Sequence, residues 1–117
     1  KSKFIKGDIS DKKVLKNIKK WKPEVIYHLA AQSGGETAYD DPKNDYLING
    51  FGTYQICKLA KELKVKRFIY TSTTAVYGSN SKREINEKQQ IKPDSLYGIS
   101  KFAGEMFVNQ ILKKTML

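Results

Sequence analysis

The sequence predicts an α/β domain built on a parallel β-sheet. Short apolar runs alternate along the 117 residues with longer stretches of helical period, a pattern typical of strands joined by crossover helices. Small and polar residues directly follow the apolar runs, as expected where the strands of a parallel sheet end beside a ligand. The hydrophobic content of 39% is sufficient for one folded domain with a modest core.

The first part of the chain is predicted to contain two strands with a helix between them. Residues 3–9 (KFIKGDI) are predicted to be a strand. Residues 11–20 carry apolar side chains at helical spacing and begin with Asp11, which can cap a helix N-terminus. Residues 24–31 (EVIYHLAA) are predicted to be a buried strand, and residues 32–41 a polar loop that contains two glycines.

The second part is predicted to add a long helix, a third strand and a final helix. The long helix covers residues 42–63, with a proline in its first turn and two glycines near its middle that we expect to approach the sheet or a cofactor closely. Residues 67–73 are predicted to be the third strand and residues 96–113 the final helix. The polar loop 79–95 is long for a compact domain, so we expect it to lie over a substrate.

The charge of the chain indicates a solvated basic surface. The net charge is +10, and the basic residues are 20 Lys and 2 Arg that are spread along the sequence. Proteins that read nucleic-acid bases favour Arg, so we expect no nucleic-acid partner, although a positive field helps to bind an anionic small molecule. Because neither a membrane-spanning run nor a signal-peptide pattern is found, a cytoplasmic protein without a membrane partner is expected.

The lone cysteine and the lone histidine are both predicted to be structural. Cys57 lies in an apolar helical run, which indicates a buried and unreactive thiol. His28 lies inside the second predicted strand, where a hydrogen-bonded core residue is the more common role. No cluster of His, Cys and Asp has the spacing of metal ligands, so no metal is expected.

Tyr97 and Lys101 form the candidate catalytic pair. They lie four residues apart in YGISK, so a helix places them on one face, where the ammonium lowers the pKa of the phenol and favours a phenolate base. Two other pairs have the same spacing: Tyr39 with Lys43, and Tyr54 with Lys58. The surroundings must therefore distinguish the pairs.

The ends of the predicted strands supply those surroundings. Asp8 follows the first strand, the run HLAAQSGG at 28–35 ends the second, and Thr71 to Thr73 end the third. Parallel strands end at one edge of the sheet, so we expect these groups to face one crevice. Thr73 precedes Tyr97 by 24 residues, so a hydroxyl and a phenol can reach the same reacting atom, whereas the other two pairs have no such partner.

Five motifs together resemble the extended short-chain dehydrogenase/reductases, which are NAD-dependent sugar-nucleotide epimerases and dehydratases. They occur in the family's order: GDISD at 7–11, VIYHLAA at 25–31, NGFGT at 49–53, KRFIYTSTTAVYG at 66–78 and YGISK at 97–101. The resemblance implies a Rossmann-like doubly wound parallel sheet, NAD as cofactor and a nucleotide-sugar substrate. It also implies a homodimer that forms through the helices at 42–63 and 96–113.

The same resemblance implies a role for each candidate residue. Asp8 would accept a hydrogen bond from adenine, Asn49 would steady the helix and strand ends, and Lys101 would hold the nicotinamide ribose. The implied cofactor-binding residues are Asp8, Ile9, Leu29, Ala30, Ala31, Asn49, Thr71, Tyr97 and Lys101. Thr73 would hydrogen-bond the reacting sugar hydroxyl and Tyr97 would be the acid/base. The implied substrate-binding residues are Gln32, Ser33, Thr73 and Thr74.

The residues after Thr73 indicate the reaction within this family. The 4,6-dehydratases resemble one another in an Asp-Glu pair at that place, where this chain has Thr74 and Ala75. The resemblance therefore implies C4 epimerisation, in which Tyr97 takes the hydroxyl proton, hydride passes to NAD, and hydride returns to the other face of a 4-keto sugar. A decarboxylase, dehydratase or reductase of the family, or a non-catalytic Rossmann-type binding module, is the alternative; the retention of Thr73, Tyr97 and Lys101 favours an enzyme.

The resemblance covers only part of the family's fold. The Gly-rich βαβ unit that holds the pyrophosphate and the C-terminal substrate domain are both absent from the 117 residues. Residues 1–117 are therefore expected to be a partial NAD(P)-binding domain, an internal piece of a larger enzyme that is inactive alone. Structural alternatives remain for four positions: Tyr97 as a packing residue, Asp8 as a turn or cap residue, and Thr71 and Ser72 as partners for strand-end backbone groups.

Overall fold

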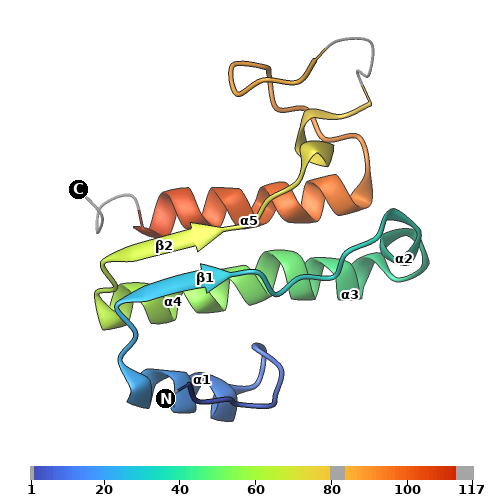
Figure 1. Cartoon of the computed structure of the whole chain (residues 1–117). Coiled ribbons are helices and arrows are strands. Elements are labelled where there is room, and N and C mark those ends of the chain that lie inside the picture. The colour runs from blue at the N-terminus through green and yellow to red at the C-terminus, as the bar shows by residue number, and fades with distance from the viewer. Residues whose placement is uncertain (1, 80–83, 113–117) are drawn as a thin grey trace.

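A computed structural model describes residues 2–79 and 84–112, which form two strands and one layer of helices (Figure 1). The elements in chain order are α1 (Lys12–Trp21), β1 (Val25–His28), α2 (Gly35–Asp40), α3 (Pro42–Tyr46), η1 (Leu47–Gly52), α4 (Thr53–Leu63), β2 (Arg67–Tyr70), η2 (Thr74–Tyr77) and α5 (Leu96–Leu112). The η1 segment is a π-helix and η2 is a 3-10 helix.

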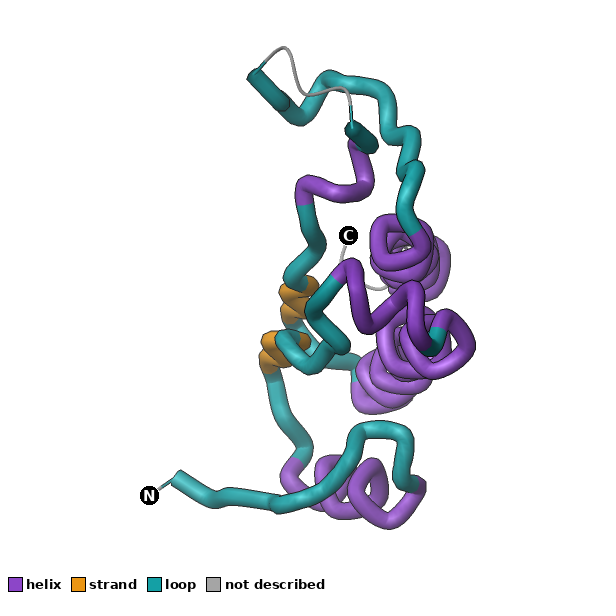
Figure 2. Tube along the Cα trace, turned by 90° about the vertical axis from the view of Figure 1, so that its right-hand side faces the viewer, coloured by secondary structure: helices purple, strands orange, loops and turns teal. Residues whose placement is uncertain are grey.

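The two strands form a parallel sheet, as predicted. Val25 pairs with Arg67 at one end of the ladder and His28 pairs with Tyr70 at the other. The helices lie on one side of the strands (Figure 2), so only one face of the sheet is covered within the described residues. This is the arrangement of an α/β domain in which long crossovers join parallel strands.

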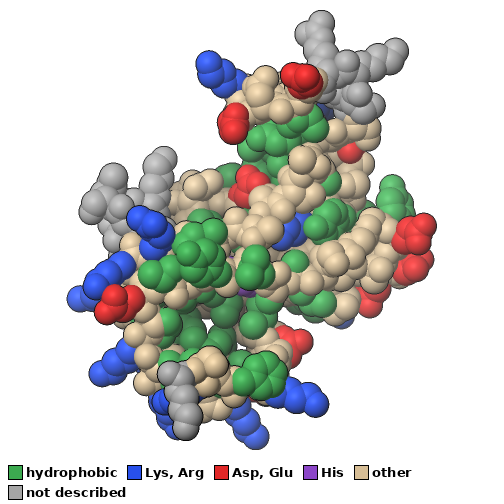
Figure 3. All heavy atoms as spheres, viewed as in Figure 1, with side chains coloured by type: hydrophobic (Ala, Val, Ile, Leu, Met, Phe, Trp, Pro, Cys, Tyr) green, Lys and Arg blue, Asp and Glu red, His purple; other side chains and the backbone are tan. Residues whose placement is uncertain are grey.

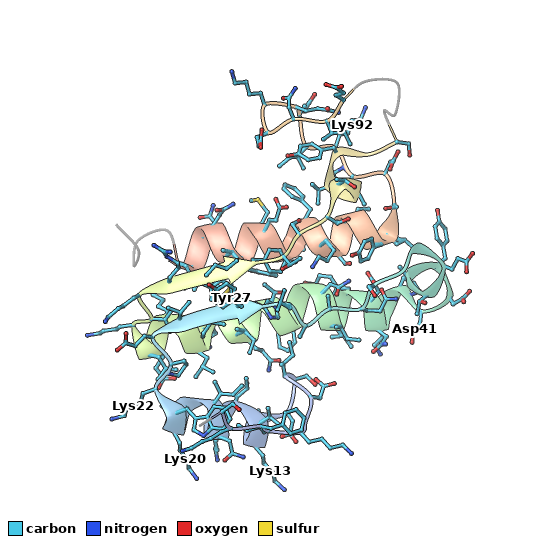
Figure 4. The ribbon with its side chains drawn as sticks, viewed as in Figure 1. Lys13, Lys20, Lys22, Tyr27, Asp41 and Lys92 are labelled. Carbon is cyan, nitrogen blue, oxygen red and sulfur yellow. The ribbon has the colours of Figure 1, made fainter. Side chains whose placement is uncertain are left out.

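The first predicted helix is confirmed as α1. The Asp11 side chain accepts a hydrogen bond from the Lys13 backbone N–H and caps the N-terminus. At the other end Lys22 adopts the left-handed conformation, with φ of 48°, and its N–H donates to the Lys19 carbonyl. Lys13, Lys20 and Lys22 point away from the body of the protein (Figure 4), which is the solvated placement expected of the scattered lysines.

The predicted long helix is confirmed in extent, because α3, η1 and α4 follow one another without a break from Pro42 to Leu63. Its two glycines do approach other groups closely, although not the sheet. A Cβ on Gly50 would lie 2.9 Å from the ring of Tyr46, and a Cβ on Gly52 would lie 3.4 Å from Ile9. The glycines therefore allow contacts of η1 with a side chain of its own helix and with the N-terminal segment.

Three predictions about local structure are wrong. Residues 3–9 form no strand, because within the described residues β1 and β2 pair only with each other and the segment gains no ladder. Residues 35–40 form the helix α2 and not a loop, since Ala38 is completely buried there. The second and third predicted strands end three residues early, at His28 and Tyr70, where their pairing stops.

The core lies between the sheet and the helices. Its buried members come from α4, the α4–β2 turn, β2 and the end of α5: Ile56, Cys57, Ala60, Val65, Phe68 and Leu112. On the opposite face of β1 apolar side chains are exposed, and Figure 3 shows such side chains gathered over the strands. Tyr27 and Leu29 there are 67% and 69% exposed. No helix in the described residues combines the length and apolar character needed to cross a membrane.

Gly104 of α5 provides a test of this packing. A Cβ at this position would lie 2.9 Å from the Tyr70 ring carbon that bears the hydroxyl, and 3.2 Å from the Asn49 carbonyl oxygen. We expect Gly104→Ala to lower the free energy of unfolding by about 1–3 kcal/mol through overpacking, despite the better helix propensity of Ala. Gly35→Ala is the control, because a methyl group added there would meet no atom within 4 Å apart from the chain neighbours and the backbone of its own helix. Equal urea-unfolding midpoints for the two variants would contradict this packing.

Candidate active site

Lys101 is the most constrained side chain of the candidate site. It lies on α5 and is only 3% exposed. Its Nζ donates to the Thr71 carbonyl at 2.6 Å, just beyond β2, and lies 4.5 Å from the ring centroid of Tyr70. Burial lowers the pKa of Lys101, while the carboxylates of Glu105 and Asp45 oppose that shift. The ammonium is thus held at the end of the sheet, where the sequence predicted it.

Tyr97 lies in the first turn of α5, one helical turn before Lys101 and half-buried. The helix start is fixed by Ser95, whose Oγ accepts a hydrogen bond from the Gly98 N–H at 3.0 Å. A Cβ on Gly98 would lie 2.6 Å from the Ala75 carbonyl oxygen, so this turn packs directly against η2. The structure therefore brings the turn that carries Tyr97 onto the segment that follows Thr73.

Thr73 begins that segment. Its Oγ1 accepts a hydrogen bond from the Ala75 N–H at 3.2 Å and caps η2, while its backbone is extended. The hydroxyl hydrogen remains available for a further acceptor, because a threonine hydroxyl both accepts and donates. Thr71 and Thr74 on either side are exposed. The strand-end hydroxyls thus lie at the same edge as the Lys101 ammonium. Thr71 also pairs through its backbone, since its N–H donates to the His28 carbonyl at 3.3 Å.

Asn49 joins the parts of this edge. Its Oδ1 accepts from the Gln32 N–H at 2.9 Å, and its Nδ2 lies 3.2 Å from the Gln32 carbonyl. The same Nδ2 lies 3.0 Å from an Asp45 carboxylate oxygen and 3.1 Å from the Ser100 hydroxyl. Asn49 therefore connects the segment after β1 with α3 and α5, which is the steadying position that the family resemblance implies.

The segment after β1 fits a dinucleotide. Leu29 and Ala30 are exposed and Ala31 is half-buried, so a flat apolar group can lie against this chain. The Gln32 Oε1 is buried and has no hydrogen-bond donor among the described residues. An unpartnered buried acceptor is costly unless a ligand supplies the donor. Neighbouring Ser33 is exposed, so both predicted substrate contacts lie at the same edge.

Asp8 is not placed as predicted, because residues 3–9 form no strand that could end there. Its carboxylate accepts from the Ser10 N–H at 2.7 Å, and its carbonyl accepts from the Asp11 N–H at 3.0 Å. The hydrogen bonds to Ser10 lower the pKa of Asp8. Asp8 is thus a turn residue, as the structural alternative had it, while Ile9 packs on the core; a role for either in binding adenine stays a prediction.

The two other Tyr–Lys pairs lie elsewhere. Tyr39 belongs to α2, not to the predicted loop, and is 69% exposed. Tyr54 lies on α4 with the Lys58 Nζ 5.6 Å from its ring centroid, beside a hollow of about 420 Å³ between α1 and α4. The surroundings of these two pairs therefore differ from those of Tyr97, and the catalytic role of Tyr97 stays a prediction.

Three residues near the pair were missed. Glu105 and Ser100 lie on α5, where Glu105 accepts a hydrogen bond from Ser72, and Asp45 lies on α3. The helical spacing of two of them could have indicated that they lie near the site. Glu105 is eight residues after Tyr97, on the same helix face, and Asp45 is four residues before Asn49. Ser100 lies inside the motif YGISK itself.

The predicted loop 79–95 includes residues 80–83, which lie outside the described residues. Its two ends are held beside η2, because Ser79 N–H donates to the Asp94 carboxylate at 2.8 Å and Lys92 N–H donates to the Val76 carbonyl at 3.0 Å. A hollow of about 270 Å³ lies between these ends, near Lys92 (labelled in Figure 4). A role for this loop over a substrate stays a prediction.

His28 and Cys57 are structural, as predicted. Cys57 is completely buried, and burial raises the pKa of its thiol to about 12. His28 is 4% exposed, and its Nε2 lies 2.9 Å from the Thr53 hydroxyl oxygen. Thr53 donates its hydrogen to the Asn49 carbonyl at 2.6 Å, so it must accept from Nε2–H. Burial, with a smaller effect of Lys101, lowers the pKa of His28 to about 4, so the ring is neutral at pH 7.

The buried His28 predicts a pH dependence of stability. The folded protein binds this proton only near pH 4, whereas the unfolded chain binds it near 6.5. Protons therefore favour the unfolded state between these values, and the free energy of unfolding should fall by about 3 kcal/mol as the pH falls from 6.5 to 4. Urea titrations of wild type and His28→Gln across this window measure the effect. The free energy of unfolding of the variant should depend less steeply on pH. Parallel curves for the two proteins would show that His28 does not cause the dependence.

Comparison with known proteins identifies the family of the chain. The family model described as GDP-mannose 4,6 dehydratase matches residues 1–117. The UDP-glucose 4-epimerase of Mycolicibacterium smegmatis is 36% identical over 93% of the chain and 35% of the relative. The dTDP-D-glucose 4,6-dehydratase of Homo sapiens is 35% identical over 91% of the chain and 31% of the relative. The chain thus spans about a third of the length of these relatives.

Solved structures show the same fold. A UDP-glucose 4-epimerase from Thermotoga maritima, solved with UDP-glucose, superposes with a TM-score of 0.88 at 30% identity, over 97% of the chain and 38% of that structure. A Bordetella bronchiseptica enzyme in complex with NAD and UDP gives a TM-score of 0.79 at 31% identity, over 89% of the chain and 33% of that structure. The fold is therefore a partial Rossmann-like α/β domain. The chain belongs to the family of NAD-dependent sugar-nucleotide epimerases and dehydratases that the GDP-mannose 4,6 dehydratase model describes.

Proposed function

We propose that residues 1–117 are the partial NAD-binding and catalytic part of a longer NAD-dependent nucleotide-sugar 4-epimerase. The observation that carries this proposal is the buried Lys101, whose Nζ is held on the Thr71 carbonyl one helical turn from Tyr97. A buried ammonium is costly, and such groups occur most often where their charge serves a function. A purely structural module gains nothing from a buried cation that is held at a strand end, one helical turn from a tyrosine.

In the proposed reaction Tyr97 accepts the proton of the sugar hydroxyl and later returns it. Lys101 stabilises the phenolate through its charge, because opposite charges at short range in a dry site favour the ionised form. Thr73 donates its free hydroxyl hydrogen to the same sugar oxygen and orients it. Gln32, Ser33 and Thr74 complete the substrate contacts in this proposal.

The cofactor would lie along the segment after β1. NAD bound there supplies the two-electron acceptor and donor that oxidation and re-reduction of the sugar carbon require. The exposed Leu29 and Ala30 and the orphan Gln32 Oε1 support this placement. Asn49 holds the segment in position, while Thr71 and Lys101 would face the ribose. The remaining proposed contacts are Asp8, Ile9, Ala31 and Tyr97.

Epimerisation is favoured over 4,6-elimination by the start of η2. Thr74 and Ala75 follow Thr73 there, so that turn offers no carboxylate to remove and return protons at carbons 5 and 6. A 4,6-dehydratase is the second candidate, because the matching family model and a relative of 35% identity bear that name. Incubation of the longer enzyme with a UDP- or dTDP-hexose distinguishes them, since an epimerase gives an isomer and a dehydratase a 4-keto-6-deoxy sugar.

Tyr97→Phe tests the assigned acid/base. Removal of the phenolic oxygen leaves the sugar proton without an acceptor, so kcat/KM for interconversion of UDP-glucose and UDP-galactose should fall by about 100- to 10,000-fold. The matched control is Tyr39→Phe, which removes an exposed hydroxyl from a pair with the same spacing and should retain wild-type activity. Full activity of Tyr97→Phe would show that another group is the base.

We also propose that the longer enzyme is a homodimer. Its two copies would meet through the long helix that runs from α3 to α4 and through α5. Apolar side chains left exposed on these helices support it: Tyr46, Leu47, Phe51, Ile99 and Met106. Met106→Glu should convert the dimer to monomers in sedimentation velocity, because a charge would be buried at the interface. Asn17→Glu on α1 adds the same charge elsewhere and should leave the dimer intact. A monomeric wild type would refute the proposal.

A further inference from the structure

Asp45 is a buried carboxyl group to which the proposed reaction gives no role. It lies on α3, is 1% exposed, and its neighbours along the helix, Asn44 and Tyr46, are exposed. Its backbone N–H donates to the Asp41 carbonyl at 3.0 Å, so the main chain is satisfied without the side chain. A carboxyl group in such a place is costly unless hydrogen bonds and a counter-charge compensate its burial.

The hydrogen bonds of Asp45 lead to the catalytic helix. Asn49 Nδ2 donates to an Asp45 carboxylate oxygen at 3.0 Å and lies 3.1 Å from the Ser100 Oγ. Ser100 Oγ in turn donates to the Tyr97 carbonyl at 3.0 Å. Asn49 is 1% exposed and Ser100 is 2% exposed, so water does not compete for these bonds. A continuous chain of hydrogen bonds therefore joins the carboxylate to the turn that carries Tyr97.

The counter-charge is Lys101, which directly follows Ser100. Burial raises the pKa of Asp45, and the Ser100 hydroxyl and the Lys101 ammonium oppose that shift. The effect is mutual, because Glu105 and Asp45 both favour the charged form of Lys101. Besides Tyr97, two titratable groups of the described residues lie near this ammonium and are neutral at pH 7: His28 from β1, and Tyr70 from β2, where burial raises the pKa to about 12.

We propose that Asp45 is a positioning residue for the reaction, which orients Tyr97 through Asn49 and Ser100 and keeps Lys101 charged. This inference rests on the proposed function of Tyr97 and Lys101. Asp45 touches neither substrate nor cofactor in this proposal. Its carboxylate on α3 accepts a hydrogen bond from the Asn49 NH₂ group. This bond fixes the orientation of the Asn49 amide, since the amide oxygen cannot donate to a carboxylate.

The first test measures Lys101 directly. In the full-length enzyme, the ¹³Cε resonance of Lys101, assigned through Lys101→Arg, is followed by NMR as the pH is raised. Asp45→Asn should lower the pKa of Lys101, because a negative charge that favours the ammonium is lost. Asp40→Asn removes an exposed carboxylate next to the same helix and should leave the titration unchanged. An unchanged pKa in Asp45→Asn would overturn the electrostatic part of the proposal.

The second test measures the reaction. The alkaline limb of the kcat/KM profile should move to lower pH in Asp45→Asn, and a purely structural role would lower activity equally at all pH values. Ser100→Ala interrupts the hydrogen-bond chain but keeps the carboxylate, so kcat should fall with KM little changed and the alkaline limb in place. Wild-type kcat in Ser100→Ala would overturn the positioning role, and this variant decides that role if Asp45→Asn does not fold.

The two tests also separate this inference from the proposed function. The NMR titration does not depend on turnover. A wild-type enzyme that epimerises no nucleotide sugar would refute the proposed function, while a shifted Lys101 pKa in Asp45→Asn would still support the coupling of the two charges. An active enzyme whose Asp45→Asn variant keeps the wild-type titration and pH profile would refute only the inference.

Discussion

The side chain of Asn49 is hydrogen-bonded to three separate parts of the chain: the backbone of Gln32 after β1, the carboxylate of Asp45 on α3 and the hydroxyl of Ser100 on α5. Asn49 lies in the π-helical segment η1. The π-helix is rare in proteins as a whole, but many of its examples occur at functional sites. The Thr53 hydroxyl donates a hydrogen bond to the Asn49 carbonyl and accepts one from Nε2–H of His28. If Asn49 were lost, the segment after β1, the long helix and α5 would each lose their common partner.

The structure also depends on the close approach of α5 to the edge of the sheet, which two glycines of this helix make possible. Gly98 lies against the Ala75 carbonyl and Gly104 against Tyr70, so closely that a Cβ at either position would force its neighbours to shift. The helix is therefore near enough for the Lys101 ammonium to reach the Thr71 carbonyl and to lie over the Tyr70 ring. Burial of the ammonium follows from this spacing, and so does its lowered pKa.

The groups behind the edge are kept neutral by the same burial. His28, Cys57 and Tyr70 all have pKa values displaced in the direction that removes charge. Among the described residues, the Lys101 ammonium is near two carboxylates that favour its charged form, Glu105 and Asp45. Within the described residues, the buried ammonium is thus accompanied by neutral groups and by two carboxylates that favour its charge.

The sequence by itself determined the elements that depend on local pattern: the capped helix α1, the unbroken stretch from Pro42 to Leu63, the parallel pair of strands and the spacing of Tyr97 and Lys101. Only the tertiary structure decided that residues 3–9 form no strand and that residues 35–40 form a helix, because a ladder needs a neighbour and Ala38 needs a core. It also decided the burial of Asp45. The physical reason is the same in each case. These features depend on hydrogen bonds and burial between residues that are distant in the chain, and the local periodicity of the sequence cannot predict such contacts.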